Sequence, residues 1–346
     1  MEKWKKQFGG KLSDELTNRY EKSPQWRDGK FMNAEETSMS INWQSLPKLL
    51  YKQFCEKKER EPEKPIPVES FHLEEFLKPS LATKFIWYGH SVVLMRINEK
   101  TLLIDPMLGP DAAPIAPFKS KRFSENTLDL IDDFPEIDLL LLTHDHYDHL
   151  DLASIEKLKP KVKQYFVALG CARHLESWGI QSDHIKEFDW WDQATFEEIQ
   201  ITFTPTRHFS GRGLTDRAKS LWGGWAFKTD RENIYFSGDS GYGEHFKEVG
   251  KRLGPFDFGI MECGQYNENW HQIHMFPEET VQAAQDAGVQ KAMAVHWCGF
   301  ALAQHSWQDP IESFTKTAKE QNLNIITPKL GQQFHYTDTY HVHWWK

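Results

Sequence analysis

Short apolar runs alternate with longer amphipathic stretches through most of the chain. Apolar runs bounded by turn residues predict strands over residues 85–88, 92–97, 101–104, 138–142, 164–168, 194–205, 224–228 and 234–237. Apolar residues at helical spacing predict helices over residues 152–158, 172–178, 244–253, 277–287 and 310–321. Early strands without helices, followed by alternating strands and helices, are typical of two sheets covered by helices. The pattern therefore predicts an α/β protein.

The N-terminal part of the chain follows a different pattern. Strand-like runs are few there, and apolar residues between Leu46 and Phe54 fall at helical spacing, so residues 43–57 are predicted to form an amphipathic helix. A proline-rich linker follows. We expect an N-terminal arm, residues 1–66, packed on a body formed by residues 67–346. Contact of the arm with a membrane, or with a second subunit of a homodimer, is the alternative.

Composition narrows the class of protein. The chain has 346 residues, of which 39% are hydrophobic and 26% charged, so it can bury a sizeable core. Its apolar runs are far shorter than the roughly 18 residues of a membrane span, and no apolar stretch follows its basic N-terminus. The net charge of −9 argues against general nucleic-acid binding. We expect a cytoplasmic protein without a nucleic-acid partner, in which peripheral contact with a membrane stays open.

The densest group of potential metal ligands is the sequence His144-Asp-His-Tyr-Asp-His149, directly after the predicted strand 138–142. Side chains two residues apart on an extended chain point the same way, so His144 and His146 can bind one cation together. The chain then turns, and Asp148 and His149 can face a second cation. Neutral imidazole and carboxylate are suitable ligands for zinc, iron or manganese. The motif therefore predicts a metal site.

One short motif cannot supply all the ligands of two metal ions. His208, Asp239 and His296 each follow an apolar run that is typical of a strand. A lone histidine at such a position is usually an ordinary polar residue, but three such residues at three strand ends indicate further ligands. A carboxylate such as that of Asp239 can bridge two ions, because its two oxygens point outward from one carbon.

These residues resemble a known family. The pattern H-x-H-x-D-H with a distant His, Asp and His resembles the metallo-β-lactamase superfamily of dinuclear hydrolases. Longer stretches are similar to the N-acyl-phosphatidylethanolamine-hydrolysing phospholipase D group, namely Trp87-Tyr-Gly-His-Ser, Leu103-Ile-Asp-Pro, Leu221-Trp-Gly-Gly-Trp, Ser237-Gly-Asp-Ser-Gly-Tyr, Lys251-Arg-Leu-Gly-Pro-Phe-Asp and Ala294-Val-His-Trp-Cys-Gly-Phe-Ala-Leu. The resemblance runs from about residue 80 to about residue 325. It implies an αββα sandwich of two mixed β-sheets flanked by helices, with the metals at the edge between the sheets.

The resemblance also implies how the ligands divide. One metal is held by three histidines, a second by an aspartate and two histidines, and one aspartate is shared by both. In that order, these residues are His144, His146 and His208; Asp148, His149 and His296; and Asp239. We expect two divalent metal ions as the cofactor, zinc in the first place, with iron or manganese as alternatives.

Two residues are expected to take part in the chemistry. His274, just before the predicted helix 277–287, matches a family histidine near the substrate phosphate. It is expected to donate a hydrogen bond to the phosphoryl group or to protonate the leaving alkoxide. A histidine packed at the start of a helix is the alternative. Asp148 is the second residue that we expect to take part in the chemistry, and it is also expected to bind a metal ion.

Other polar residues are expected to support the site. Asp105 and Asp145 are natural acceptors for the N–H groups of ligand imidazoles, although Asp105 reads equally as a turn residue. His90 matches a family position that supports the site from below. The loop 207–222 contains several basic residues, including Arg212, which either steer an anionic substrate or are solvated.

The leading functional hypothesis is a metal-dependent phosphodiesterase of the phospholipase D type. It would hydrolyse N-acylated phosphatidylethanolamine or a related phosphodiester through a hydroxide that bridges the two metals. A lactonase or other carbonyl ester hydrolase is the alternative, because a metal pair also polarises carbonyls. A non-catalytic metal-binding protein is a third reading, against which the complete ligand set argues. The charged arm shows no evident apolar surface for insertion into a membrane, so a soluble phosphodiester fits equally well.

Overall fold

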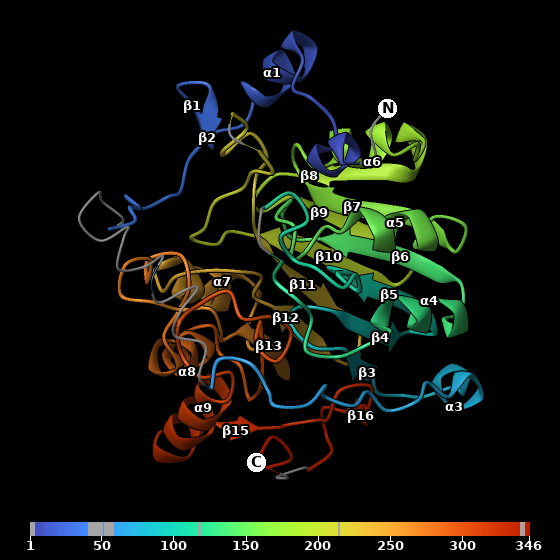
Figure 1. The fold of residues 1–346 in the computed structure, drawn as a ribbon, viewed down its shortest axis with the longest axis vertical. Coiled ribbons are helices and arrows are strands. Elements are labelled where there is room, and N and C mark those ends of the chain that lie inside the picture. The colour runs from blue at the N-terminus through green and yellow to red at the C-terminus, as the bar shows by residue number, and fades with distance from the viewer. Residues whose placement is uncertain (1–3, 41–50, 52–58, 117–118, 214, 340–342) are drawn as a thin grey trace.

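Two seven-stranded sheets pack face to face in the centre of the molecule (Figure 1). The computed structural model describes residues 4–40, 51, 59–116, 119–213, 215–339 and 343–346. The strand order is β16-β3-β4-β5-β6-β7-β8 in the first sheet and β15-β14-β13-β12-β11-β10-β9 in the second. Both sheets contain parallel and antiparallel pairs. The αββα sandwich that the sequence predicts is confirmed.

The first sheet holds the strands that lead to the histidine-rich motif. Its strands are β3 (Lys84–Trp87), β4 (Val93–Ile97), β5 (Lys100–Ile104), β6 (Ile137–Leu142), β7 (Val162–Ala168), β8 (Ile185–Phe188) and β16 (Gln333–His335). Strands β5 to β8 run parallel, and the four leucines at the end of β6 are fully buried. A strand with apolar side chains on both faces is what a parallel strand between two covered faces requires.

The second sheet holds the other candidate ligands. Its strands are β9 (Gln193–Phe196), β10 (Ile199–Thr204), β11 (Gly224–Lys228), β12 (Asn233–Phe236), β13 (Phe258–Glu262), β14 (Lys291–Val295) and β15 (Asn324–Ile325). The single strand predicted over residues 194–205 is two strands, because the chain turns back at Glu197, whose φ is 52°. Strand β13 escaped prediction because Gly259 weakens its strand pattern.

Helices cover the two outer faces of the sandwich. On the side of the first sheet lie α4 (Leu130–Asp133), α5 (Leu152–Leu158) and α6 (Ala172–Ser177), and on the side of the second α7 (His245–Leu253), α8 (Pro277–Asp286) and α9 (Asp309–Glu320) (Figure 1). The five predicted helices agree with α5 to α9 within one residue at each end. A short helix, α3 (Leu73–Leu77), precedes β3. Within the described residues, no helix has the length and apolar character that crossing a membrane would require.

The described part of the N-terminal arm forms a small unit with its own apolar contacts. It comprises the 3₁₀ turn Lys5–Phe8, helix α1 (Asp14–Tyr20) and the hairpin of β1 (Trp26–Arg27) and β2 (Lys30–Phe31). The rings of Trp26 and Phe31 lie 4.8 Å apart, and Gly10 N donates a hydrogen bond of 3.2 Å to His174 Nδ1 on α6. The helix predicted over residues 43–57 lies, apart from Tyr51, outside the described residues.

Candidate metal centre

The candidate ligands lie in loops at one edge of the sandwich. The motif from His144 to His149 connects β6 to α5, while His208, Asp239 and His296 follow β10, β12 and β14. Strands β12, β13 and β14 are parallel, and two successive antiparallel pairings give β10 the same direction. The carboxyl ends of these strands therefore meet at the same edge and bring their polar side chains together.

Three histidines form what we call the first group: His144, His146 and His208. Nδ1 of His146 lies 2.9 Å from Nε2 of His144 and 3.2 Å from Nε2 of His208. Burial lowers the pKa of His146 to about 4 and also lowers the pKa values of His144 and His208. The imidazoles are therefore neutral at pH 7, the form that binds a metal ion.

Asp148, His149 and His296 form what we call the second group. The two Nε2 atoms of the histidines are 3.3 Å apart, and Oδ2 of Asp148 lies 3.4 Å from Nε2 of His296. Burial disfavours the charged form of His149, but the carboxylates of Asp239, Asp148 and Asp105 outweigh it and raise its pKa to about 10. Three carboxylates thus lie around His149.

Asp239 lies between the two groups. Its Oδ2 atom is 3.0 Å from Nε2 of His149 and 3.1 Å from Nε2 of His296. The same oxygen lies 3.8 Å from Nε2 of His208 and 3.9 Å from Nε2 of His144. Burial alone would raise the pKa of Asp239, but His149 and His296 hold it well below its usual range. An ionised carboxylate in this position can be a ligand in both groups.

The donor atoms fit divalent transition-metal ions. Several sets of three or four of these donor atoms lie within 4.8 Å of one another, including His90 with the whole second group. They combine imidazole nitrogens with ionised carboxylates, which are the preferred ligands of zinc and related ions. Buried carboxylates this close together require compensating positive charge, which a metal ion would supply.

The backbone around the donor atoms is strained. His90, Asp105 and His296 all adopt positive φ values, of 55°, 44° and 68°. Each such residue costs about 1–3 kcal/mol, and such positions cluster at functional sites. Gly238, before Asp239, has a φ of 63°, and a Cβ there would lie 2.3 Å from the carbonyl oxygen of Gly223. Only glycine fits at this crossing.

Asp105 and His90 support the second group. Asp105 accepts a hydrogen bond of 2.8 Å from Nδ1 of His149 and another from the backbone N–H of Thr143. This contact directs Nε2 of His149 toward the group. His90 is buried and donates from Nε2 to Oδ2 of Asp148 over 2.9 Å. Both residues thus lie where the sequence analysis expected support.

Two other expectations are wrong. Asp145 contacts no ligand imidazole; it accepts from Nε2 of His174 at 3.1 Å and from the Ser220 hydroxyl at 2.6 Å. Arg212 cannot steer a substrate, because it is 1% exposed and donates to the carbonyl oxygens of Asp145 and Leu150. Both side chains hold the motif loop in shape through contacts inside the protein.

His274 lies beside both groups and contacts a carboxylate that sequence reasoning missed. The ring of His274 is 5.0 Å from that of His208 and 5.1 Å from that of His296. Its Nδ1 donates to Oε1 of Glu262 at 3.2 Å, and the same oxygen is 3.5 Å from Nδ1 of His296. Glu262 ends β13, so the strand-end signal that identified His296 would have found it had β13 been predicted.

Asn33 in the N-terminal arm was also missed. Its Nδ2 donates to the carbonyl oxygen of His208 at 2.8 Å, and its Oδ1 accepts from the backbone N–H of His208 at 3.1 Å. The indole N–H of Trp222 donates to the same Oδ1 at 2.9 Å. One amide therefore fixes the backbone of a candidate ligand. A single asparagine in a polar stretch gives no sequence signal for this role.

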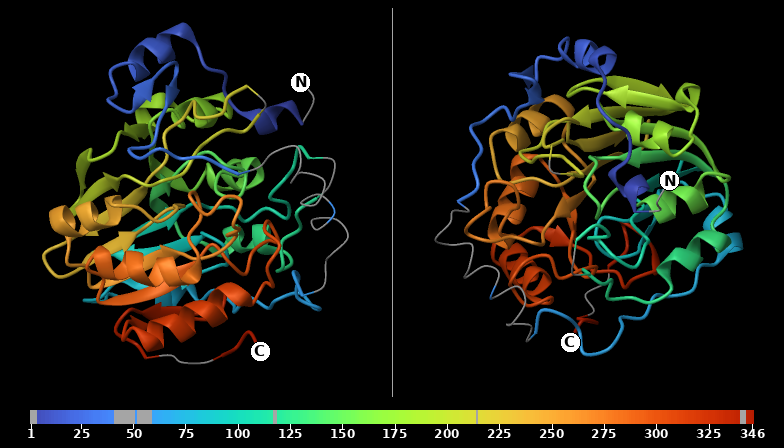
Figure 2. Two further views of the ribbon diagram at one scale, coloured as in Figure 1. Left: turned by 90° about the vertical axis from the view of Figure 1, so that its left-hand side faces the viewer. Right: turned by 45° about the horizontal axis from the view of Figure 1, so that its top comes forward.

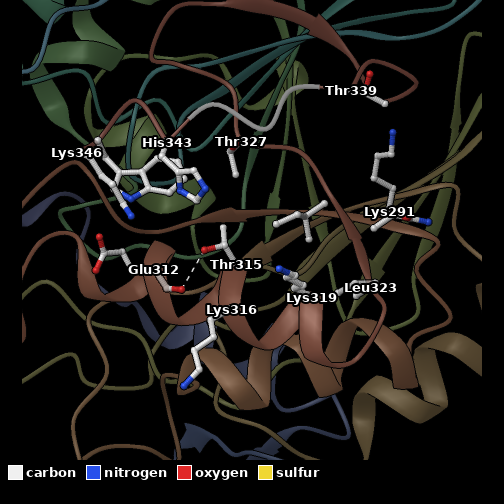
Figure 3. Close-up of a pocket in the computed structure, with 13 residues that line it drawn as sticks. Lys291, Glu312, Thr315, Lys316, Lys319, Leu323, Thr327, Thr339, His343 and Lys346 are labelled. Atoms are coloured by element: carbon white, nitrogen blue, oxygen red, sulfur yellow. Dashed lines mark hydrogen bonds between the residues drawn. The ribbon is translucent and has the colours of Figure 1, made fainter.

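A separate cavity of about 650 Å³ lies beside α9 (Figure 3). Four lysines are among its lining residues, namely Lys291, Lys316, Lys319 and Lys346. None of the His and Asp donor groups found among the described residues lines it. The candidate metal site therefore lies at the edge of the sheets and not in this cavity.

Comparison with known families agrees with this geometry. A family model described as a beta-lactamase superfamily domain matches residues 100–297. The matched range includes both donor groups and Asp239. It also includes Glu262 and His274.

Similar proteins extend the match beyond that domain. An uncharacterized protein of Mycobacterium tuberculosis is 35% identical over 94% of this chain and 88% of its own. The N-acyl-phosphatidylethanolamine-hydrolyzing phospholipase D 1 of Caenorhabditis elegans is 29% identical over 94% of this chain and 98% of its own. Among solved structures, the metallo hydrolase Igni18 of Ignicoccus hospitalis aligns with a TM-score of 0.57 at 20% identity. That alignment covers 73% of this chain and 97% of Igni18, and it supports the fold alone.

Proposed function

Because the chain belongs to the metallo-β-lactamase superfamily of metal-dependent hydrolases, we propose that it is a phosphodiesterase of the phospholipase D type. The substrate in this proposal is N-acylated phosphatidylethanolamine or a related phosphodiester. The observation that carries the proposal is the pair of donor groups that share Asp239, with His274 beside both. The nematode phospholipase adds support, because it matches along nearly the full length of both chains.

The two groups would hold two divalent ions, zinc in the first place. Such ions lower the pKa of a water molecule and neutralise phosphoryl oxygens as negative charge builds on them. Asp148, with 14% of its side chain exposed, orients the attacking water by accepting a hydrogen bond. Water attacks phosphorus, and the bond between phosphorus and the ethanolamide oxygen breaks.

His274 would provide the proton for the leaving group. Its Nδ1 donates to Glu262, which leaves Nε2 as the ring nitrogen that can meet a substrate. The side chain is 12% exposed, so it is accessible and yet fixed in orientation. The ring, protonated on both nitrogens, transfers the Nε2 proton to the leaving alkoxide and gives a neutral ethanolamide. The attacking water releases one proton to solvent, and the phosphatidate retains its oxygen.

A phospholipid substrate would bring the protein to a membrane surface. We therefore propose peripheral contact with membranes, tested by sedimentation with vesicles of phosphatidylcholine. Vesicles that contain N-acylated phosphatidylethanolamine should bind the His274→Gln variant more strongly than vesicles without it. Equal binding to both would indicate a soluble phosphodiester as the substrate instead.

The reaction is tested with metal-loaded protein in water enriched in ¹⁸O. N-acylated phosphatidylethanolamine should yield phosphatidate that contains ¹⁸O and an unlabelled N-acylethanolamine, as measured by mass spectrometry. His184→Gln, a His-to-Gln change like that of the His274→Gln variant but at an exposed position, should leave the products unchanged. Opening of lactones without cleavage of any phosphodiester would support a carbonyl ester hydrolase. Absence of turnover on both classes of substrate would support a metal-binding protein.

A further inference from the structure

Residues 31–40 cross the surface beside the metal centre, and we call this segment the strap. In Figure 2 it is the blue segment that leads from the N-terminal hairpin toward the grey trace. At one end the backbone N–H of Phe31 donates to Ala218 O at 2.9 Å, and at the other that of Ser40 donates to Asn269 O at 2.8 Å. The strap therefore connects the loop after β10 with the loop after β13.

A cavity of about 610 Å³ lies between the strap and the loop after β10. Volumes of this size are typical of sites for small molecules. His208, a candidate ligand, forms part of the wall, and so does Phe209. The ring of Phe209 lies 4.5 Å from that of His146. The cavity therefore adjoins the first group.

The cavity wall contains three cations, Arg27, Lys30 and Arg217. The guanidinium of Arg217 lies 4.0 Å above the ring of Phe209, on the side of the cavity that adjoins the metal centre. Within the part of the chain that the structure describes, no carboxylate lies within 4.0 Å of any of the three. All three are exposed, and a surplus of cations around a cavity favours an anionic ligand.

Two carboxylates also belong to the wall, and one of them is already engaged. Glu35 accepts a hydrogen bond of 2.9 Å from the backbone N–H of Glu244 and lies 3.9 Å from Arg207. Glu36 is exposed. With three cations and two carboxylates, one of which is already engaged, the wall carries a surplus of positive charge.

Apolar residues share the rest of the wall with the polar residues Asn33, Thr37 and Ser38. Met32 and Met39 are among the lining residues, together with Phe31 and Trp222, each of which is only 1% exposed. Met32 is 37% exposed, although a long apolar side chain gains by burial. Methionine adapts its shape to an apolar ligand more easily than branched side chains do. The wall therefore suits a ligand that combines an acidic group with an apolar body.

We propose that this cavity binds the apolar part of an anionic amphiphile whose acidic group lies between Arg217 and the metal centre. The inference rests on the proposed function, because phosphatidate and its parent phosphodiester are anions of this kind. The strap thus acts as a specificity element that belongs to the N-terminal arm, and Met32 and Arg217 are the residues that select the ligand.

The proposal is tested by calorimetric titration of the metal-loaded protein, and of protein treated with a chelator, with octyl phosphate, inorganic phosphate and octanol. Octyl phosphate should bind at least tenfold more tightly than either of the other probes. Arg217→Gln should lower the affinity for octyl phosphate about tenfold, because a charged hydrogen-bond donor is lost. Met32→Ser, at an exposed position, should weaken the binding of octyl phosphate but not that of inorganic phosphate.

Lys219→Gln is the matched control. Its ammonium belongs to the same loop, but it donates to Gly29 O, lies 5.5 Å from the ring of Trp26 and does not line the cavity. Octyl phosphate should bind this variant as it binds the wild type. Equal affinities for octyl phosphate and inorganic phosphate would overturn the proposal, as would unchanged binding in both Arg217→Gln and Met32→Ser. If these variants lose octyl phosphate although no phosphodiester is cleaved, the cavity proposal stands and the proposed reaction fails.

Discussion

The two donor groups of the metal centre differ in charge and in what supports them. The first group consists of imidazoles alone, and burial lowers the pKa of each. The second group contains Asp148, and carboxylates raise the pKa of His149 and His296 against the effect of burial. Divalent cations favour a site whose ligands include a carboxylate. We therefore expect the second group to bind its ion more tightly.

The supporting contacts differ in kind as well. His149 and His296 in the second group face the buried carboxylates Asp105 and Glu262 through their Nδ1 atoms. In the first group, His208 donates from Nδ1 to the carbonyl oxygen of Ile273, and its backbone is held by Asn33. The ligands of the second group are thus held by buried carboxylates. Those of the first group depend on how the chain, including the N-terminal arm, is folded around them.

The largest effect should follow from removing the residue that the groups share. We expect the wild type to contain close to two metal ions per chain and Asp239→Ala to lose both ions and all activity, because both groups lose a ligand. His149→Ala should reduce the content toward one ion. Elemental analysis measures these values, with His184→Ala as the control. A wild type that is fully active with a single ion would contradict the two-group interpretation.

A second prediction separates chemistry from metal binding. His274→Gln should retain the metal content and lower kcat by about 10²–10⁴, with a much smaller change in KM, because a proton donor is lost from the transition state. The defect should shrink for a nitrophenyl leaving group, which departs without protonation. Steady-state kinetics on both substrates measure this. An equal loss on both would indicate phosphate binding by His274, and loss of metal would make it a ligand.

A third prediction concerns the support of the second group. Asp105→Asn should lower the affinity for the more tightly bound metal ion about 10- to 100-fold, because the carboxylate fixes and polarises His149. The affinity for the more weakly bound ion should be unchanged. Competition with a chromophoric chelator measures both affinities. Asp183→Asn, at an exposed position, is the control. Equal weakening of both ions would remove the distinction between the groups.

The smallest effect should come from the arm. Asn33→Ala should lower the affinity of the first group for its metal ion about tenfold, because His208 loses two backbone hydrogen bonds. Thr37→Val is the matched control, since Thr37 lies in the same strap but its hydroxyl accepts from Arg207 and donates to the carbonyl oxygen of Glu35. Chelator competition again provides the measurement. If the two variants behave alike, Asn33 merely attaches the arm.

Local spacing allowed much of the fold and of the candidate site to be predicted. The apolar run of β6 and the His-x-His pattern after it depend on neighbouring residues, whose directions the backbone itself sets. The same holds for the ends of helices α5 to α9. The predicted strand ends also indicated His208, Asp239 and His296, because the direction of a strand brings its end to a particular edge of the sheet.

Only the tertiary structure decided which side chains meet across the chain. Asn33 and His208 are 175 residues apart, and Asp105 and His149 are 44 apart, so no periodicity relates them. Arg212 reads in the sequence as one more charge in a polar loop, yet carbonyl oxygens of the motif loop surround it. A residue type determines what a side chain can bind, but its partner depends on how distant segments pack, and this packing assigns Asp145 and Arg212 to the scaffold of the metal centre.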